Sequence, residues 1–324
     1  MQTEPLRLRV TQFQAEAKDV VSLELRDAGG KPLPAFAPGA HLEITVPSTG
    51  ASSAPLIRHY SLCNDARERD RYVVAVGRVQ DGRGGSQSVH EGVRVGATLM
   101  VQPPRNNFPL VDDAGHYRFI AGGIGITPIL SMVRWCEAHN KTWSLLYCTR
   151  SRQRTAFLEE LKSFGERVRF HFDDEAGGPL DVASALAHSL ADEHVFCCGP
   201  KPLMLAVEGH CASRDPTRVH FEWFSAKEVA HDAGASRPFS VILRQSGVTL
   251  DVPADRSILE TMEDHGLSVP FSCREGLCRT CETPICAGEA DHRDHVLSDS
   301  ERRAQRSILI CVSRARGDVL ELDA

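Results

Sequence analysis

Ten residues decide the fold of the last third of the chain: Ser272-Cys273-Arg274-Glu275-Gly276-Leu277-Cys278-Arg279-Thr280-Cys281. A fourth cysteine, Cys311, follows further along the chain. The spacing C-x4-C-x2-C…C is the pattern by which four thiolates hold a plant-type [2Fe-2S] cluster. A short irregular loop presents three of them, and a distant strand supplies the fourth. We therefore expect an electron-transfer protein whose metal ligands are Cys273, Cys278, Cys281 and Cys311.

A zinc site is the main alternative use of these cysteines. Zinc ribbons favour two C-x2-C pairs, so the spacing favours the iron–sulfur cluster. Gly276 allows the backbone to curl around a cluster. Most of the other cysteines are expected to be buried small hydrophobic side chains, because they lie in apolar stretches: Cys63, Cys136, Cys148, Cys197, Cys198, Cys211 and Cys286.

The composition is that of a globular protein with more than one domain. The chain has 324 residues, of which 42% are hydrophobic and 25% charged, and its net charge is -6. This length predicts two or three domains, and the acidic balance gives no reason to expect nucleic-acid binding. No secretion signal or membrane span is recognisable, so we expect a cytoplasmic protein that binds no membrane and keeps its thiols reduced.

Residues 1–110 contain short runs of alternating apolar and polar residues separated by Gly and Pro turns. The clearest runs are at 20–25, 41–46 and 72–76. Several strands at this spacing predict a closed antiparallel β-barrel.

Residues 111–227 alternate buried strands with helical patterns. The strand at 117–121 leads through a Gly-rich turn into a helix at 129–139. Further strands are predicted at 144–148, 168–172 and 194–198, and further helices at 155–164, 182–190 and 202–211. This alternation predicts a doubly wound α/β domain.

The last part of the chain begins after a linker. Residues 228–237 are small, polar and unpatterned, as in a linker. Residues 238–324 combine a hairpin at 239–252, a helix at 258–265 and the cysteine loop. They predict an α+β ferredoxin domain of the plant type, a β-grasp fold, and hence a multidomain protein.

Two turns in the α/β domain are typical of nucleotide binding. Gly122, Gly123 and Gly125 lie between a strand and a helix, where a pyrophosphate can approach backbone amides and the positive end of the helix dipole. Such a turn also occurs where a strand must simply reverse into a helix, so the motif alone is weak. The second turn, Cys198-Gly199-Pro200, closes another strand at the same edge, where open α/β sheets bind ligands.

The barrel contains a candidate site for a phosphorylated aromatic ring. Arg58, Tyr60 and Ser61 stand on one predicted strand, and Arg83 precedes Gly84-Gly85-Ser86. The arginine and tyrosine suit charge and stacking, and the glycine amides and serine hydroxyl suit a phosphate. A solvated turn and a core tyrosine are equally open interpretations of these residues.

Taken together, these motifs resemble the phthalate dioxygenase reductase family, which includes vanillate demethylase reductases. The order of flavin barrel, nicotinamide domain and C-terminal ferredoxin covers essentially the whole chain. The matching stretches are Arg58–Asp65, Gly82-Arg83-Gly84-Gly85-Ser86, Pro104–Leu110, Ala121–Pro128, Cys198-Gly199-Pro200 and Gly288–Asp294. Two positions depart from the family pattern: Gly77 replaces a common lysine, and Arg279 replaces a small residue.

The resemblance implies a set of site residues. FMN would be held by Arg58, Tyr60, Ser61, Val74, Ala75, Val76, Arg83, Gly84, Gly85 and Ser86, with Thr127 and Phe224 as the catalytic positions beside its ring. NAD would be held by Gly122, Gly123, Gly125, Pro128, Cys198, Gly199 and Pro200. Phe224 would cover the flavin where nicotinamide enters, although a core aromatic at a strand end is the simpler interpretation. Beside the cluster, the charge of Arg279 suggests a raised reduction potential.

The expected activity follows from the cofactors. NADH gives two electrons as a hydride and the cluster accepts one at a time, so FMN is expected to accept the hydride and release single electrons to the cluster. No Rieske motif is present, so the resemblance implies a separate terminal oxygenase of the Rieske non-haem iron type as the acceptor, either an aromatic-ring oxygenase or a demethylase. A redox carrier or sensor with a non-oxygenase partner is the alternative. Nothing in the sequence demands more than a monomer.

NADH rather than NADPH is the nucleotide that the family implies. Arg150, Arg152 and Arg154 follow a predicted strand end and offer a site for a ribose phosphate, or form a solvated basic turn.

Overall fold

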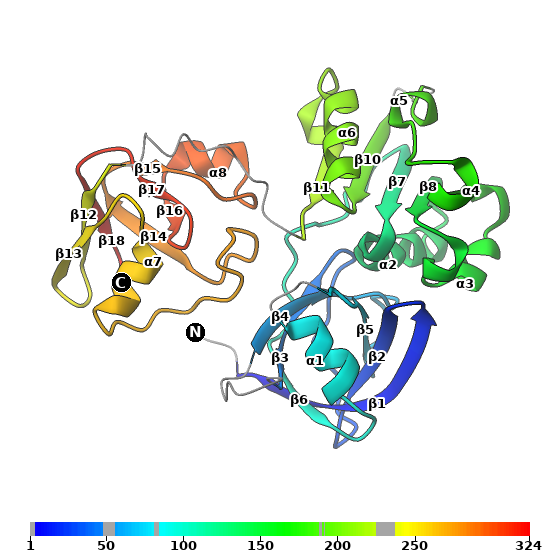
Figure 1. The fold of residues 1–324 in the computed structure, drawn as a ribbon, viewed down its shortest axis with the longest axis horizontal. Helices are drawn as coiled ribbons and strands as arrows, with labels where there is room; N and C mark the ends of the chain where they lie inside the picture. Colours follow the sequence, from blue (N-terminus) through cyan, green and yellow to red (C-terminus); the bar gives the residue numbers. More distant parts are fainter. Residues whose placement is uncertain (1–3, 48–55, 81–83, 188–189, 191, 225–236) are drawn as a thin grey trace. The chain divides into compact units, whose positions relative to one another are not determined.

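The computed structural model describes residues 4–47, 56–80, 84–187, 190, 192–224 and 237–324. The chain forms two compact units, Met1–Phe224 and Ser225–Ala324 (Figure 1). Arg83 and residues 228–236 of the expected linker lie outside the described residues. No helix in the described part is long and apolar enough to cross a membrane.

The first unit begins with an antiparallel sheet of six strands, as predicted. Its order is β4-β3-β6-β1-β2-β5, and an isolated bridge between Leu62 and Val74 links its two edges. The strands are β1 (Leu6–Ala17), β2 (Val20–Asp27), β3 (His41–Val46), β4 (Leu56–Ser61), β5 (Tyr72–Gly77) and β6 (Thr98–Val101), and helix α1 (Gly85–Gly92) follows β5. Alternate side chains fill the interior, which contains buried Leu8, Leu23, Leu42 and Val74.

The rest of the first unit is a parallel sheet covered by helices on both faces, again as predicted. Its order is β11-β10-β7-β8-β9, which reverses direction beside β7 as in doubly wound folds. The strands are β7 (His116–Gly122), β8 (Trp143–Thr149), β9 (Val168–Phe172), β10 (Glu193–Cys198) and β11 (Val219–Glu222). The helices are α2 (Ile126–Ala138), α3 (Leu158–Lys162), α4 (Asp173–Ala176), α5 (Val182–Ala185) and α6 (Lys201–Cys211).

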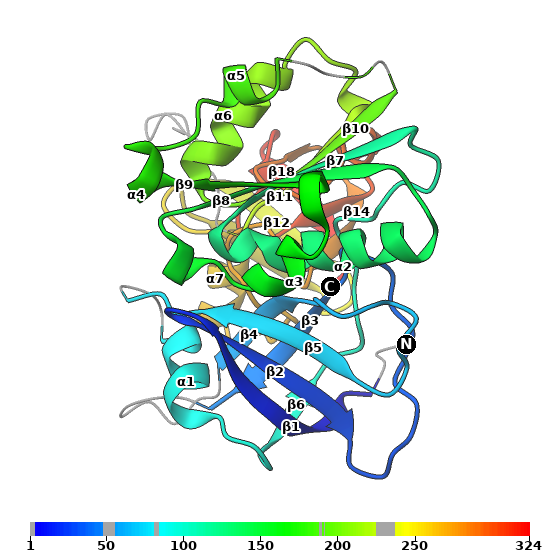
Figure 2. The same cartoon turned by 90° about the vertical axis from the view of Figure 1, so that its right-hand side faces the viewer.

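Helix α2 lies between this sheet and the barrel (Figure 2). It is buried along most of its length and shares one hydrophobic core with Phe196 of the sheet and Phe108 and Cys63 of the barrel part. Helix α6 packs on the opposite face, where Met204 and Val207 form a separate core.

Two predicted helices are shorter than expected. The helix predicted at 155–164 is reduced to α3, because Thr155 Oγ1 donates to the backbone of Ser151 and contacts Thr149 Oγ1. Such local side-chain bonds favour a turn over a helix. Phe157 then adopts a φ of 57° at the start of α3. The helix predicted at 182–190 is described only as α5, which is capped by Asp181.

The second unit has a mixed sheet with the order β13-β12-β18-β14-β16, in which β12 and β18 are parallel. Its elements are β12 (Phe239–Leu243), β13 (Val248–Val252), α7 (Ile258–Asp264), β14 (Glu282–Ala287), β15 (Ala290–Asp291), α8 (Asp299–Ala304), β16 (Ser307–Leu309), β17 (Arg314–Ala315) and β18 (Val319–Leu322). The predicted hairpin and helix are both present. A capping box between Ser257 and Glu260 starts α7, whose buried face packs on the sheet.

Candidate functional site

The predicted flavin residues of the barrel come together at the end of β4 and the start of α1. A Cβ atom on Gly85 would lie 2.1 Å from Arg58 Nε, so only glycine lets α1 begin against this guanidinium. The hydroxyl of Tyr60 is buried without a hydrogen-bond partner among the described residues, and burial raises its pKa to about 12. A buried hydroxyl that lacks a partner fits a ligand oxygen. The barrel therefore provides a cradle that suits a flavin phosphate and side chain.

Three of the barrel residues predicted to contact the flavin have buried side chains that cannot reach a ligand. Val74 and Val76 are buried in the barrel core, and Ala75 is buried against the nucleotide domain. These three residues therefore have only backbone atoms to offer a ligand. Ser86 Oγ accepts a hydrogen bond from Val79 N at 3.1 Å, which ties the first turn of α1 to the residue that lies two positions after β5.

The predicted nucleotide turns also meet in space, but most of their glycines serve packing. A Cβ on Gly125 would lie 2.2 Å from Cys198 O, and one on Gly199 would lie 2.9 Å from Gly122 Cα. Pro200 similarly fills the space beside Gly122. Gly123 differs, because it has a φ of +52° and no atom near its missing Cβ. Of these glycines, Gly123 is therefore the one with open space beside its backbone.

Thr127 and Pro128 lie in the first turn of α2, and both are buried. Thr127 Oγ1 donates to Ile124 O at 3.0 Å, which fixes the turn that carries Gly123. Phe224 is 42% exposed. It is therefore not a core aromatic in this unit, and its ring is available to a ligand.

Glu222 is a candidate site residue that sequence reasoning missed. It lies on β11 opposite Cys198 of β10, and Ser61 Oγ donates to its Oε2 at 3.5 Å. The residue as a whole is only partly buried, but its carboxyl group points inward, and burial raises its pKa to about 8. Burial also raises the pKa of the Cys198 thiol, and the nearby Glu222 adds to that shift. A single glutamate on a short strand gives no recognisable signal in the sequence.

Two of the arginines that follow β8, Arg152 and Arg154, form ion pairs with carboxylates of the same unit. Arg152 donates to Glu175 of α4, with 3.0 Å between Nη2 and Oε2, and lies 4.4 Å above the Phe172 ring. Arg154 pairs with Asp19 of the barrel at 2.7 Å. Two of the three arginines considered for a ribose phosphate therefore already have carboxylate partners.

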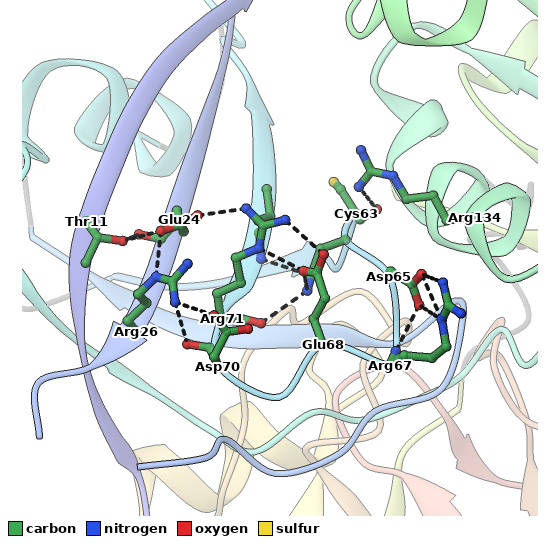
Figure 3. Close-up of polar contacts among 12 residues, drawn as sticks. Thr11, Glu24, Arg26, Cys63, Asp65, Arg67, Glu68, Asp70, Arg71 and Arg134 are labelled. Atoms are coloured by element: carbon green, nitrogen blue, oxygen red, sulfur yellow. Dashed lines mark hydrogen bonds and ion pairs between the residues drawn. The ribbon is translucent and has the colours of Figure 1, made fainter. Parts of the chain in front are cut away.

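A cavity of about 600 Å³ lies elsewhere in the first unit, between β1, β2 and α3. Arg152, a candidate for the ribose phosphate, lines it, but none of the residues predicted to hold FMN or to form the two nucleotide turns does. Its arginines are paired: Arg71 with Glu24 and Glu68 (Figure 3), Arg134 with Glu160, and Arg152 with Glu175. Arg134 also donates to Cys63 O at 2.6 Å and so ties α2 to the barrel. Apart from Arg152, the cavity is therefore lined by residues outside the candidate site.

The four predicted cluster cysteines lie together in the second unit. The Cys273 thiol contacts those of Cys278 and Cys311, and Cys281 contacts Cys311. The neighbouring Cys278 lowers the pKa of Cys273, which favours its thiolate. Two backbone amides, Glu275 N and Leu277 N, lie 3.3 and 3.4 Å from Cys273 Sγ. Thiols that point toward one another beside sulfur-facing amides fit an iron–sulfur cluster.

The described residues contain no group of three or more His, Cys, Asp or Glu arranged around one metal ion. A binuclear cluster does not require such a group. Each of its two irons takes two thiolates and two sulfides, so the four cysteines need to form only two pairs. The contacts Cys273–Cys278 and Cys281–Cys311 would suit two such pairs.

Arg279 is not an isolated cation beside the cluster. Its Nη2 donates to Glu301 Oε1 at 2.7 Å and to Val296 O at 3.2 Å. The carboxylate of Glu301 therefore offsets part of its charge, and the raised cluster potential stays a prediction. With a φ of 60°, Arg279 also anchors the loop to the start of α8.

Comparison with known proteins extends this picture. Residues 119–209 match the oxidoreductase NAD-binding domain, and residues 241–316 match the 2Fe-2S iron-sulfur cluster binding domain. The phthalate dioxygenase reductase of Burkholderia cepacia is 44% identical over 324 residues, covering 98% of this chain and 97% of the relative. The vanillate O-demethylase oxidoreductase of a Pseudomonas strain is 38% identical, covering 97% and 98%.

This chain belongs to the phthalate dioxygenase reductase family. A solved structure of a phthalate dioxygenase reductase has a TM-score of 0.71 and 42% identity, covering 99% of this chain and 98% of that one. Its title describes a modular structure for electron transfer from pyridine nucleotides to [2Fe-2S]. As a member of the phthalate dioxygenase reductase family, the chain is an oxidoreductase with flavin, nicotinamide and iron–sulfur domains.

Proposed function

We propose that this chain is the reductase component of a multicomponent oxygenase system, which passes electrons from NADH through FMN and a [2Fe-2S] cluster to a separate terminal oxygenase. The observation that carries the proposal is the combination, in one chain, of the Arg58–Gly85 cradle, the open turn at Gly123 and the four facing cysteines. The proposed parts are residues 1–110 for FMN, 111–227 for NAD and 238–324 for the cluster, joined by 228–237.

The proposed roles follow from the geometry. FMN, when bound, takes up a hydride as an electron pair and releases the electrons singly. Arg58 offers charge, and Tyr60 offers an unpartnered hydroxyl. Thr127 fixes the turn at Gly123, and exposed Phe224 is available to cover the ring. Cys273, Cys278, Cys281 and Cys311 are the proposed cluster ligands.

Glu222 is proposed to accept or donate the proton that accompanies NADH oxidation. Each NADH delivers one proton with its two electrons, and the cluster accepts only electrons. Because its pKa is raised to about 8, the Glu222 carboxyl is protonated at neutral pH and lies beside Ser61. It is therefore able to give or receive a proton near pH 7 to 8.

NADH is the proposed nucleotide. In sheets of this kind the ribose that carries the extra phosphate of NADPH lies at the end of the second strand, here β8. At this strand end Arg152 forms an ion pair with Glu175, and the negative charge of Glu175 disfavours the binding of a phosphate.

The partner is proposed to be a Rieske non-haem iron oxygenase, with the reductase acting as a monomer. Relatives of this chain include subunits of a phenoxybenzoate dioxygenase and of a toluene-4-sulfonate monooxygenase system. This supports a separate oxygenase as the acceptor.

An anaerobic titration of the purified protein with NADH tests the proposal. Flavin and cluster absorbance should both bleach, with uptake of about three electrons per chain, two by the flavin and one by the cluster. A protein without flavin, or one whose cluster responds only to dithionite, would instead be a carrier or sensor. Adding a Rieske oxygenase after the titration should reoxidise the cluster.

A further inference from the structure

Behind the cysteine loop of the second unit lies a buried polar group formed by His292, Asp294 and Arg302. The side chains of His292 and Asp294 are 5% and 0% exposed, with 3.7 Å between Nδ1 and Oδ1. Arg302 Nη2 lies 3.6 Å from Asp294 Oδ2. Both ring nitrogens of His292, Asp294 Oδ1 and Arg302 Nε have no hydrogen-bond partner among the described residues. Such an arrangement is costly, so it calls for a functional explanation.

Asp294 braces the cysteine loop from behind. Its Oδ2 accepts hydrogen bonds from Val296 N and Leu297 N at 3.2 and 2.8 Å, which fixes its own segment as a turn. That segment contacts Gly276, because a Cβ there would lie 3.0 Å from Asp294 Cα. The next residue, His295, donates from its backbone N to Gly276 O at 3.0 Å. The position of Gly276 therefore depends on the turn that the Asp294 carboxylate holds.

Gly276 lies between the two residues whose amides face a predicted ligand. Glu275 N and Leu277 N lie 3.3 and 3.4 Å from Cys273 Sγ. Hydrogen bonds to ligand sulfurs tune the reduction potential of a cluster and orient its ligands. A shift of Gly276 would move both amides at once.

The charge of Asp294 is expected to affect the reduction potential of the cluster as well. Reduction adds an electron to the cluster, and a buried carboxylate nearby opposes it. The His292 ring does not compensate, because burial lowers its pKa and leaves it uncharged at neutral pH. Arg302 is 34% exposed, so solvent screens part of its charge.

We propose that Asp294 is a positioning residue of the iron–sulfur centre: through Gly276 it fixes the two amides on Cys273 Sγ, and its buried charge lowers the reduction potential of the cluster. This rests on the proposed ligation of the cluster by Cys273.

Two substitutions separate the two effects. Asp294→Asn keeps an oxygen for the Val296 and Leu297 amides but removes the charge, so the midpoint potential should rise while the rate of cluster loss stays within about twofold of wild type. Asp294→Ala removes the acceptor as well, so the cluster should be lost several-fold faster in the presence of a chelator. Asp291→Asn is the matched control, because Asp291 is 41% exposed and pairs with Arg293. It should change neither quantity.

The measurements are a mediated redox titration of the full chain, followed by the EPR signal of the reduced cluster, and the rate of absorbance loss with chelator. This proposal alone would be overturned if the wild type carries the cluster, Asp294→Asn has the same midpoint potential as Asp291→Asn, and Asp294→Ala loses its cluster at the wild-type rate. A wild type that binds no cluster would overturn the proposed ligand set and this proposal together. If Asp294→Ala does not fold, the potential of Asp294→Asn decides.

Discussion

The Ser61 hydroxyl on β4 donates a hydrogen bond to Glu222 Oε2 on β11, 3.5 Å away. This bond joins the barrel to the last strand of the nucleotide sheet. It places an acid with a raised pKa beside a predicted flavin residue.

Replacing Glu222 with Gln should change the pH dependence of stability. The folded protein keeps the Glu222 proton until about pH 8, whereas the unfolded chain loses it near the ordinary value of 4.5. The unfolded state therefore binds fewer protons in this window, and wild-type stability falls as pH rises from about 4.5 to 8. In Glu222→Gln this slope should be absent, with a gain of about 1–3 kcal/mol at pH 8 and little change at pH 5.

Melting temperatures between pH 5 and 9 measure this effect, because a multidomain cofactor protein need not unfold in two states. Glu159→Gln is the control, since this side chain is 83% exposed. Parallel curves for wild type and Glu222→Gln would show that Glu222 does not titrate in this range.

Replacing Gly85 with Ala should weaken flavin binding. The new methyl group would overlap Arg58 and displace its guanidinium from the cradle. Losing one hydrogen bond to a charged group costs about 1.5–3 kcal/mol, so the Kd for FMN should rise about tenfold to a hundredfold. Gly92→Ala is the matched control at the other end of α1, where a Cβ would meet only Ser88 Oγ at 3.9 Å. Fluorescence titration of the flavin-free protein measures both, and equal affinities would refute the cradle.

Replacing Glu175 with Gln should relax the preference for NADH. Arg152 would lose its carboxylate partner and could bind the extra phosphate of NADPH. The pair is half exposed, so we expect a modest gain of about threefold to tenfold in kcat/KM for NADPH and no change for NADH. Steady-state reduction of an artificial acceptor gives both values. Exposed Glu166→Gln should leave both values unchanged, and an equal rise for NADH would argue against a phosphate-specific effect.

Replacing Cys278 with Ser should remove the cluster and leave the flavin reaction intact. The first and second units are separate compact bodies, so the loss of one metal ligand in the second should not disturb the first. We expect FMN content and NADH oxidation with ferricyanide to stay within about twofold, whereas cytochrome c reduction through the cluster disappears. Cys286→Ser, at an exposed cysteine, should retain the cluster. Because a serine oxygen can also ligate iron, Cys278→Ala is the decisive variant, and a loaded cluster there would exclude this residue as a ligand.

The regular parts of the fold were predictable because their signals are local. Alternation identified β2, β3 and β5, and the cysteine spacing identified the ferredoxin domain. The length of α3 was not predictable, since it depends on the hydrogen bonds that Thr155 makes with the preceding turn.

The site was predictable only where residue type and spacing carry the chemistry. The four cysteines meet that condition. Glu222 does not, because its importance arises from a neighbour 161 positions earlier in the chain. The glycines show a different limit: Gly122, Gly125 and Gly199 look like nucleotide-binding residues in the sequence, yet each is required by close packing, against the Pro200 ring for Gly122 and against backbone atoms for the other two.

The bond between Ser61 and Glu222 also determines where the chain can be divided. A recombinant barrel that ended near residue 110 would lack the acid that its own serine contacts, and Arg134 would no longer reach Cys63 O. A fragment that ends after Phe224 keeps both contacts. Engineers who wish to attach a different electron acceptor should therefore exchange the second unit as a cassette and leave residues 1–224 as one piece.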